Sequence, residues 1–188
     1  MSGIGATKND TDCVDWSDDG RFPIHAILTS GVTTRATQVL QRAKVPFDCH
    51  EYRYDSQPGD IGLHAAHCLG VEPARLLKTL IVLIDDRPAV ALVPCDRHLD
   101  MKQLAQAASA KRCRMAEADL AERLSGYVIG GISPLGMKKR VPVYVETMVM
   151  SFSKLLFNGG RSGLQLEVDS MALLQVLDAK AAAISRYS

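Results

Sequence analysis

Two apolar stretches near the middle of the chain dominate its pattern of hydrophobic and polar positions. Residues 76–84 and 89–94 are rich in leucine, isoleucine and valine, and the polar residues 85–88 separate them. Short apolar runs with β-branched residues are typical of strands buried on both faces, and a short polar link between two such runs is typical of a hairpin. We therefore expect a pair of buried strands at the centre of a sheet.

Other segments alternate between helical and strand periodicity. Thr33 or Thr34 can cap a helix that Pro46 ends. Further helices are expected over residues 60–70, 100–110, 117–124 and from Asp169 or Ser170 to about 185, and further strands over residues 47–54, 113–115, 142–146, 152–157 and 164–169. Strands and helices are interspersed, and both hairpins and helical crossovers connect the strands. The pattern therefore predicts an α/β or α+β fold with a mixed sheet.

Residues 126–136 break the periodicity without becoming polar. They are too rich in glycine and proline for regular structure and too apolar for a solvated linker, so we expect this loop to pack against another part of the chain. Its glycines could let the backbone approach a ligand, and their N–H groups could hold an oxyanion or phosphate. A purely structural turn is the alternative, and the stretch is not a P-loop because Met137 follows Gly136.

Charge divides the chain into two parts. The whole chain has 22 Lys and Arg against 21 Asp and Glu, but residues 1–31 hold five aspartates against one lysine and one arginine. We expect residues 1–31 to be an acidic, flexible extension and residues 32–188 to form a single domain. The near-neutral total gives no strong general attraction to nucleic acid or membrane, although a local basic track would suffice for RNA.

Targeting and cysteine patterns favour a protein of the cytoplasm. The sequence lacks a signal-peptide pattern and any apolar run of about 18 residues, so no membrane partner is expected. Its five cysteines are irregularly spaced, which is unlike a disulfide framework. His64, His67 and Cys68 form the one metal-like cluster, and no second ligand pair accompanies it, so we expect no metal site. The sequence points to no cofactor.

Lys78 interrupts an otherwise apolar strand. A lysine is almost never fully buried without a partner, so this one either reaches solvent at the start of the strand or ends in a pocket, where it could bind phosphate or orient a carbonyl. No nucleophile constellation accompanies it, because Ser133 lacks the G-x-S-x-G context and neither His50 nor His98 has a carboxylate partner in the sequence. Any catalysis would depend on positioning and backbone electrostatics.

Four motifs, taken together, resemble the YbaK family of aminoacyl-tRNA deacylases, most closely the bacterial Cys-tRNA(Pro) deacylases. They are HEY at residues 50–52, KTL at 78–80, GY at 126–127 leading into GGISPLG at 130–136, and GGRSGL at 159–164. The resemblance covers roughly residues 32–185. It implies a barrel-like mixed sheet with surrounding helices, related to the editing domain of prolyl-tRNA synthetase, and a free-standing hydrolase that removes a wrong amino acid, typically cysteine, from proline tRNA.

The resemblance also implies roles for particular residues. Lys78 would bind the tRNA end and orient the ester, and the backbone of Gly130, Gly131 and Ile132 would surround the carbonyl. The substrate would be contacted by Tyr52, Thr79, Ser133 and Gln165, and tRNA phosphates by Lys138, Lys139, Arg140 and Arg161. Catalysis would be substrate-assisted, through the cysteine thiol or a ribose hydroxyl. The partners implied are the acceptor end of an aminoacyl-tRNA and prolyl-tRNA synthetase.

One departure from the family pattern matters: Gln165 stands where close relatives carry an aspartate. An amide keeps hydrogen bonding but loses a negative charge that could attract the substrate's α-amino group. A deacylase for another small amino acid such as alanine therefore stays open. A second alternative is a non-catalytic module that binds aminoacyl-tRNA or a synthetase, with Lys138, Lys139 and Arg140 on phosphates.

Overall fold

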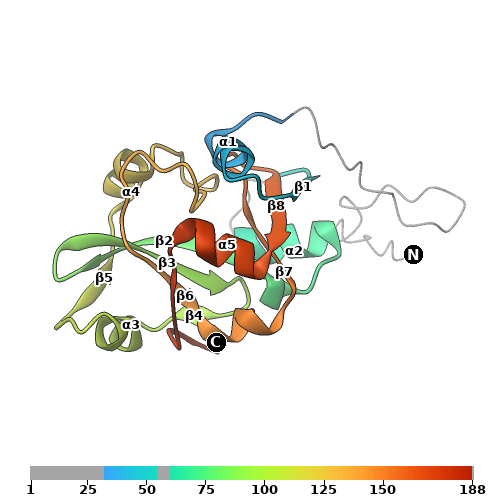
Figure 1. Cartoon of the computed structure of the whole chain (residues 1–188). Coiled ribbons are helices and arrows are strands. Elements are labelled where there is room, and N and C mark those ends of the chain that lie inside the picture. Colours follow the sequence, from blue (N-terminus) through green and yellow to red (C-terminus); the bar gives the residue numbers. More distant parts are fainter. Residues whose placement is uncertain (1–31, 55–59, 188) are drawn as a thin grey trace, which may run out of the picture.

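The computed structural model of the chain describes residues 32–54 and 60–187 (Figure 1). The predicted extension over residues 1–31 and the predicted break at 56–59 lie outside these residues. Among the described residues, no helix combines the length and apolar character needed to cross a bilayer.

The expected central hairpin is present. Strands β2 (Leu76–Ile84) and β3 (Arg87–Pro94) pair antiparallel from Leu77 opposite Pro94 to Ile84 opposite Arg87. Asp85 and Asp86 at the turn both have positive φ, 45° and 65°. Two consecutive residues with positive φ are typical of the tight turns whose twist matches that of the two strands.

One mixed sheet contains most strands. Its order is β1 (Phe47–Glu51), β8 (Leu164–Asp169), β7 (Lys154–Asn158), β2, β3, β6 (Val143–Glu146) and β9 (Lys180–Ala182), with β5 (Cys113–Met115) also paired to β2. The β2–β7, β3–β6 and β6–β9 pairs are parallel, and the others are antiparallel. The mixed sheet is confirmed, but its closure into a barrel is not, since the order ends at β1 and β9.

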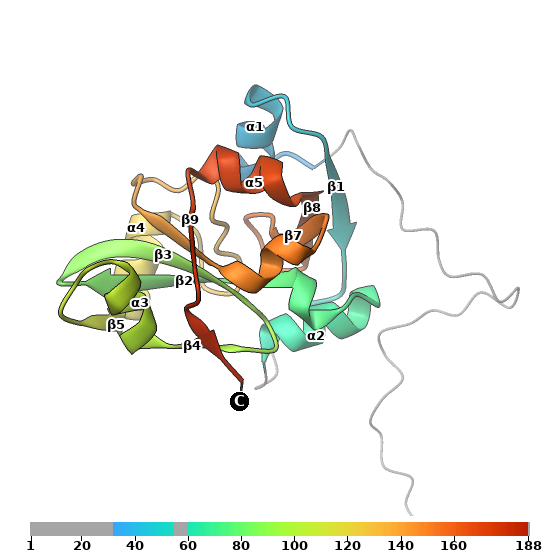
Figure 2. The same cartoon turned by 60° about the horizontal axis from the view of Figure 1, so that its bottom comes forward.

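Helices cover both faces of the sheet. Leu77 and Ile81 of β2 join the largest core cluster with residues of α1 (Arg35–Arg42), α4 (Ala118–Ser125) and α5 (Ser170–Leu177). The alternate residues of β2 belong to two smaller clusters, with α2 (Ile61–Leu69) and α3 (Met101–Ala107). Figure 2 shows α1 and α5 above the sheet and α2 and α3 below it. Two 3₁₀ turns, Pro73–Arg75 and Thr147–Ser151, were not predicted.

The sheet has an interruption along one edge of β2. On this side β7 pairs only with Leu76 and Leu77, and β5 pairs only with Val82–Ile84. The Ala116 N–H donates to the Ile81 carbonyl at 3.0 Å, so the chain that follows β5 stays beside β2 as far as Ile81. On this side of β2, no strand among the described residues pairs with residues 78–80. The interruption opens a cleft beside Lys78.

The prediction of a terminal helix to about residue 185 is wrong. Helix α5 ends at Leu177, because Asp178 adopts the left-handed conformation at φ 52° and ψ 44°. The chain then forms β9, beside β6, and the short strand β10 (Ser185–Arg186), which pairs with β4 (His98–Leu99). The alanine-rich sequence after Asp178 favours a helix locally, but long-range pairing overrides that preference.

Glu146 fixes this C-terminal segment. Its Oε2 accepts hydrogen bonds from the backbone N–H groups of Ile184 and Ser185, at 2.9 and 2.7 Å. Burial would raise the pKa of the Glu146 carboxyl, but the hydrogen bonds from Ser185, Ile184 and Met148 outweigh burial and lower it. The ionised carboxylate therefore stabilises the end of the fold.

Candidate functional site

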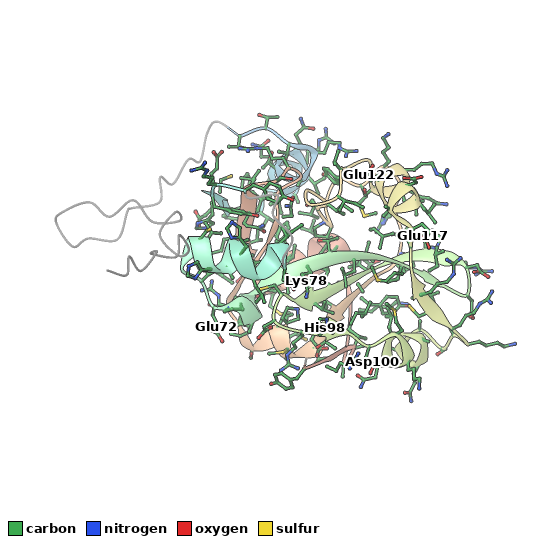
Figure 3. The ribbon with its side chains drawn as sticks, turned by 180° about the vertical axis from the view of Figure 1, so that it is seen from behind. Glu72, Lys78, His98, Asp100, Glu117 and Glu122 are labelled. Carbon is green, nitrogen blue, oxygen red and sulfur yellow. The ribbon has the colours of Figure 1, made fainter. Side chains whose placement is uncertain are left out.

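A cleft of about 570 Å³ lies at the interruption in the sheet. Residues 76–81 of β2 form its floor. One wall comes from the start of α2, and the opposite wall from Met115, α4 and the loop residues Ile129, Gly130 and Ile132. Asn158 and Gln165, at the ends of β7 and β8, close the cleft. Figure 3, seen from behind, shows Lys78 beside α2 near the middle of the molecule, with Glu117 and Glu122 on the α4 side.

Lys78 ends in the cleft, as the pocket interpretation predicts. Its Nζ donates to the Cys95 carbonyl at 3.0 Å and lies 3.5 Å from Oδ2 of Asp60. The side chain is 20% exposed. Because an ammonium carries three N–H donors, these two contacts hold the side chain in place and leave a donor for a ligand.

Asp60 has two functions at this site, and the sequence predicted only a helix start near it. Its Oδ1 accepts from the N–H groups of Gly62 and Leu63, at 2.9 and 3.3 Å, and so caps α2. Its Oδ2 faces Lys78. A Cβ added at Gly62 would lie 2.6 Å from Cβ of Cys95 and 3.4 Å from Cγ of Lys78, so only glycine lets α2 approach this closely.

Three buried polar atoms near the cleft have no hydrogen-bond partner within residues 32–54 and 60–187. They are the Thr79 Oγ1, the Gln165 Oε1 and the Tyr52 Oη. Buried polar atoms are nearly always hydrogen-bonded, so unpaired ones beside a cleft indicate where a ligand's polar groups fit. Thr79 and Gln165 line the cleft directly.

Tyr52 is placed behind the lining of the cleft. It packs beside α2, with its ring edge-on to the ring of His64 at 6.2 Å between centroids. Burial raises the pKa of its hydroxyl, an effect that the neighbouring Gln165 side chain partly offsets. The hydroxyl is therefore a proton donor beside Gln165 at neutral pH.

Gln165 is 4% exposed, although glutamine side chains are mostly exposed in proteins. Strand β8 is paired with β1 along one edge and with β7 along the other, and the successive residues Leu164, Gln165 and Leu166 are all buried, so both faces of the strand are covered there. Leu164 and Leu166 point into the main core, and Gln165 points to the opposite face, toward the cleft.

The loop over residues 126–136 packs against the β7–β8 turn, as its apolar character predicts. The Asn158 Nδ2 donates to the Gly130 carbonyl at 3.0 Å, and a Cβ added at Gly131 would lie 3.0 Å from the Arg161 Cα. Gly130 and Ile132 line the cleft, but Gly131 lines a neighbouring cavity. Ser133 is fully buried and its Oγ accepts from the Leu135 N–H at 3.3 Å, so the structure does not bring it to the cleft.

The expected tRNA-binding cations lie outside the cleft. Lys138 and Lys139 are exposed after α4, and their backbone N–H groups donate to the last carbonyls of that helix. Arg140 lies 3.8 Å from Asp178. Arg161 forms an exposed ion pair with Glu51 at 2.6 Å and lines the neighbouring cavity.

Cysteine and metal chemistry are also constrained. Burial raises the pKa of the Cys95 thiol to about 12, and its Sγ donates to the Pro73 carbonyl at 3.2 Å, so it remains a thiol at neutral pH. In the part of the chain that the structure describes, no group of three or more His, Cys, Asp or Glu side chains is placed to hold a metal ion. Cys68 Sγ lies 3.5 Å from Nε2 of His64.

Comparison with known proteins places the chain in a family. Residues 63–176, more than half of the chain, match the sequence model of the aminoacyl-tRNA editing domain. The chain is 32% identical over 153 residues to EbsC of Enterococcus faecalis, covering 81% of this chain and 93% of that protein. EbsC is described as a proposed Cys-tRNA(Pro)/Cys-tRNA(Cys) deacylase.

Other relatives are longer or more distant. A proline–tRNA ligase of Geobacter metallireducens is 29% identical over 94 residues, which is half of this chain but only 16% of the ligase. A solved structure described as a proposed trans-editing enzyme for prolyl-tRNA synthetase superposes with a TM-score of 0.72 at 19% identity, covering 83% of this chain and 99% of that one. This second likeness concerns the fold.

Proposed function

We propose that this chain, which belongs to the family of aminoacyl-tRNA editing domains, hydrolyses the ester of mischarged tRNA, with Cys-tRNA(Pro) as its preferred substrate. The observation that carries the proposal is the cleft itself, where the Lys78 ammonium and the unpaired Thr79 and Gln165 oxygens converge. The reaction adds the oxygen of water to the carbonyl carbon and breaks the bond from that carbon to the ribose oxygen. The ribose oxygen leaves with a proton, giving free amino acid and uncharged tRNA.

Lys78 positions the ester and stabilises negative charge on its oxygens. An ammonium held by Asp60 and the Cys95 carbonyl presents its remaining donor without reorganisation, which favours a transition state with a developing oxyanion. The backbone of Gly130 and Ile132 forms the wall beside the carbonyl, and Gly131 shapes the loop by packing against Arg161.

Gln165 and Thr79 contact the aminoacyl group. The Gln165 Oε1 accepts a hydrogen bond from the α-amino group, and the Thr79 hydroxyl bonds a further polar atom of the substrate. Tyr52 lies behind the cleft lining and next to Gln165. Because Gln165 is neutral, it binds the amino group more weakly than an aspartate would.

A group of the substrate itself, either the cysteine thiol or a ribose hydroxyl, takes the place of a protein side chain and orients by a hydrogen bond the water that attacks the carbonyl carbon. This proposal is supported by the high pKa of the Cys95 thiol and by the burial of Ser133 away from the cleft. Editing of this kind is needed because a pocket shaped for proline cannot strongly reject amino acids of similar size.

The tRNA acceptor end is the proposed RNA partner, and prolyl-tRNA synthetase is a proposed protein partner. The similarity to a segment of proline–tRNA ligases supports the second of these. Lys138, Lys139, Arg140 and Arg161 would contact phosphates around the site. We place the reaction in the cytoplasm, in keeping with four cysteines that form no disulfide with one another in the described residues.

The test is a panel of proline tRNAs charged with cysteine, alanine or serine. We expect the fastest deacylation of Cys-tRNA(Pro), and preference for alanine would assign the protein to another small amino acid. Lys78→Ala should remove most deacylation activity without unfolding the protein. The control, Lys102→Ala on the exposed side of α3, should leave deacylation unchanged. Binding of charged tRNA without hydrolysis above background would make the chain a binding module and overturn the proposal.

A further inference from the structure

A second cavity, of about 460 Å³, adjoins the cleft. The two share one loop as a wall: Ile129, Gly130 and Ile132 line the cleft, whereas Val128 and Gly131 line the second cavity. Five successive residues therefore serve both spaces. A ligand that fills the cleft can therefore extend past this loop and place a second group in the second cavity.

Arg35, at the start of α1, is held in this cavity by two contacts. Its guanidinium stacks over the Tyr127 ring, 4.1 Å from the ring centroid, and its Nη2 donates to the Gly126 carbonyl. Tyr127 is buried and its hydroxyl donates to the Leu135 carbonyl at 2.7 Å, so the ring is itself fixed. A guanidinium has five N–H groups, and most of them remain available to a ligand.

The opposite side of the cavity comes from the β7–β8 turn. Arg161 and Ser162 line it, and Thr33 adds a hydroxyl-bearing side chain from the α1 side. Thr34 also lines the cavity, but its hydroxyl already donates to the Gly159 carbonyl at 2.6 Å. Arg161 is paired with Glu51, but both side chains are 48% exposed, and such pairs contribute little in water. A stronger anion could therefore take the Arg161 guanidinium from Glu51.

Charge distinguishes this cavity from another one, near β1 and β8. No acidic side chain lines the second cavity, whereas Asp48, Glu167 and Asp169 line the other. Two arginines with hydroxyl groups are the donor set that proteins use for phosphate oxygens.

Two of the glycines that line the cavity, Gly126 and Gly160, let the backbone approach its arginine and tyrosine side chains closely. Gly126 has a φ of +70°, and a Cβ there would lie 2.7 Å from Nη1 of Arg35 and 2.7 Å from Cγ of Lys138. At Gly160, with a φ of +97°, a Cβ would lie 2.8 Å from the Tyr127 ring. The side chains of Arg35 and Lys138 therefore both pack against Gly126, and only glycine leaves them that space.

We propose that this second cavity binds the phosphodiester on the 5′ side of the terminal nucleotide, with Arg35 as its principal ligand. The inference rests on the proposed function, which puts the ester of that nucleotide in the cleft. The ribose that carries the ester also carries, through its 5′ oxygen, the phosphate that joins it to the rest of the RNA. A phosphate site one loop away from Lys78 meets that constraint.

The experiment compares two substrates that differ in this phosphate. Cysteinyl-tRNA(Pro) carries it, and the cysteinyl ester of adenosine does not. Arg35→Gln should raise KM for the tRNA substrate about tenfold with little change in kcat, and its effect on the adenosine ester should be below about twofold. The control is Arg42→Gln, on the exposed last turn of the same helix, which should leave both substrates unaffected.

Salt dependence gives a second measurement, using uncharged acceptor-stem RNA. Loss of one phosphate contact should lower the slope of log Kd against log salt concentration by about 0.7 to 0.9 in Arg35→Gln. An equal loss on both substrates would show that Arg35 is only structural, and an unchanged slope and KM would also overturn the inference. If the wild type hydrolyses no charged tRNA, the proposed function fails, and the acceptor-stem measurement still decides for or against the phosphate site.

Discussion

Asp60 joins helix capping to the placement of Lys78, and substitutions can separate these two roles. Asp60→Asn keeps an oxygen that accepts from the N–H groups of Gly62 and Leu63 and removes only the charge that faces Lys78. Asp60→Ala removes both. Replacing a capping residue by alanine costs about 1 kcal/mol, and a partly exposed ion pair contributes at most about 1 kcal/mol.

The expected free energies of unfolding follow directly. Asp60→Asn should lose at most about 1 kcal/mol, and Asp60→Ala about 1 to 2 kcal/mol, so the difference of about 1 kcal/mol measures the cap. Urea denaturation followed by circular dichroism gives both values, provided that the slope with urea is unchanged. For deacylation, weaker positioning of Lys78 by about 1 kcal/mol corresponds to a loss of about fivefold in kcat in both variants.

Asp100 provides the matched control. It caps α3 in the same manner, with Oδ1 accepting from the N–H groups of Lys102 and Gln103 at 2.9 and 3.0 Å, but it does not line the cleft. Asp100→Ala should therefore cost about 1 kcal/mol of stability and leave deacylation unchanged. The reasoning is refuted if Asp60→Asn deacylates like the wild type, because the charge would then have no part in positioning Lys78.

Three further substitutions test other contacts. Gly62→Ala places a Cβ 2.6 Å from Cβ of Cys95, so it should lower the free energy of unfolding, measured by urea denaturation, by about 1 to 3 kcal/mol and should also slow deacylation. Unchanged stability would show that α2 can shift freely. Glu146→Gln tests pH dependence, because the folded-state pKa of the Glu146 carboxyl is below the ordinary 4.5. The wild type should be more stable than the variant by its full margin above about pH 4.5, and this margin should shrink as the pH falls through the folded-state pKa. A margin that stays constant from pH 7 to pH 3 would contradict this. Gln165→Asp should lower KM for charged tRNA, since a carboxylate attracts the α-amino group, and should lower thermal stability, since the residue is 4% exposed; an unchanged KM would remove Gln165 from the aminoacyl site.

Local chemistry explains what the sequence predicted well. Thr34, Asp60 and Asp169 cap their helices by contacts within three residues, so a short window of sequence contains both partners. Lys78 was recognisable because it is a cation inside an apolar strand. The loop over residues 126–136 was predicted to be packed because its apolar content is incompatible with solvent.

Long-range contacts explain what the sequence did not show. Strand β9 exists because Tyr144 pairs with Lys180, far away along the chain, and no local pattern encodes that pairing. Arg35 is held in its cavity by Gly126 and Tyr127, which lie about ninety residues further along the chain. Ser133 lies within a motif that suggested substrate contact, but the turn to Leu135 points it into the core.

The interruption beside β2 has a consequence for how the site distinguishes substrates. The two segments that border the interruption are hydrogen-bonded to the same continuous strand, β7 before it and β5 with Ala116 after it. From Leu77 to Ile81 there are four residue steps, about 13 Å at 3.3 Å each. Moving these two segments apart would require stretching a strand that is already extended. The width of the interruption is thus set by a covalent length, and selection among amino acids of different size falls to the side chains that line the cleft there, such as Met115 and Ile129.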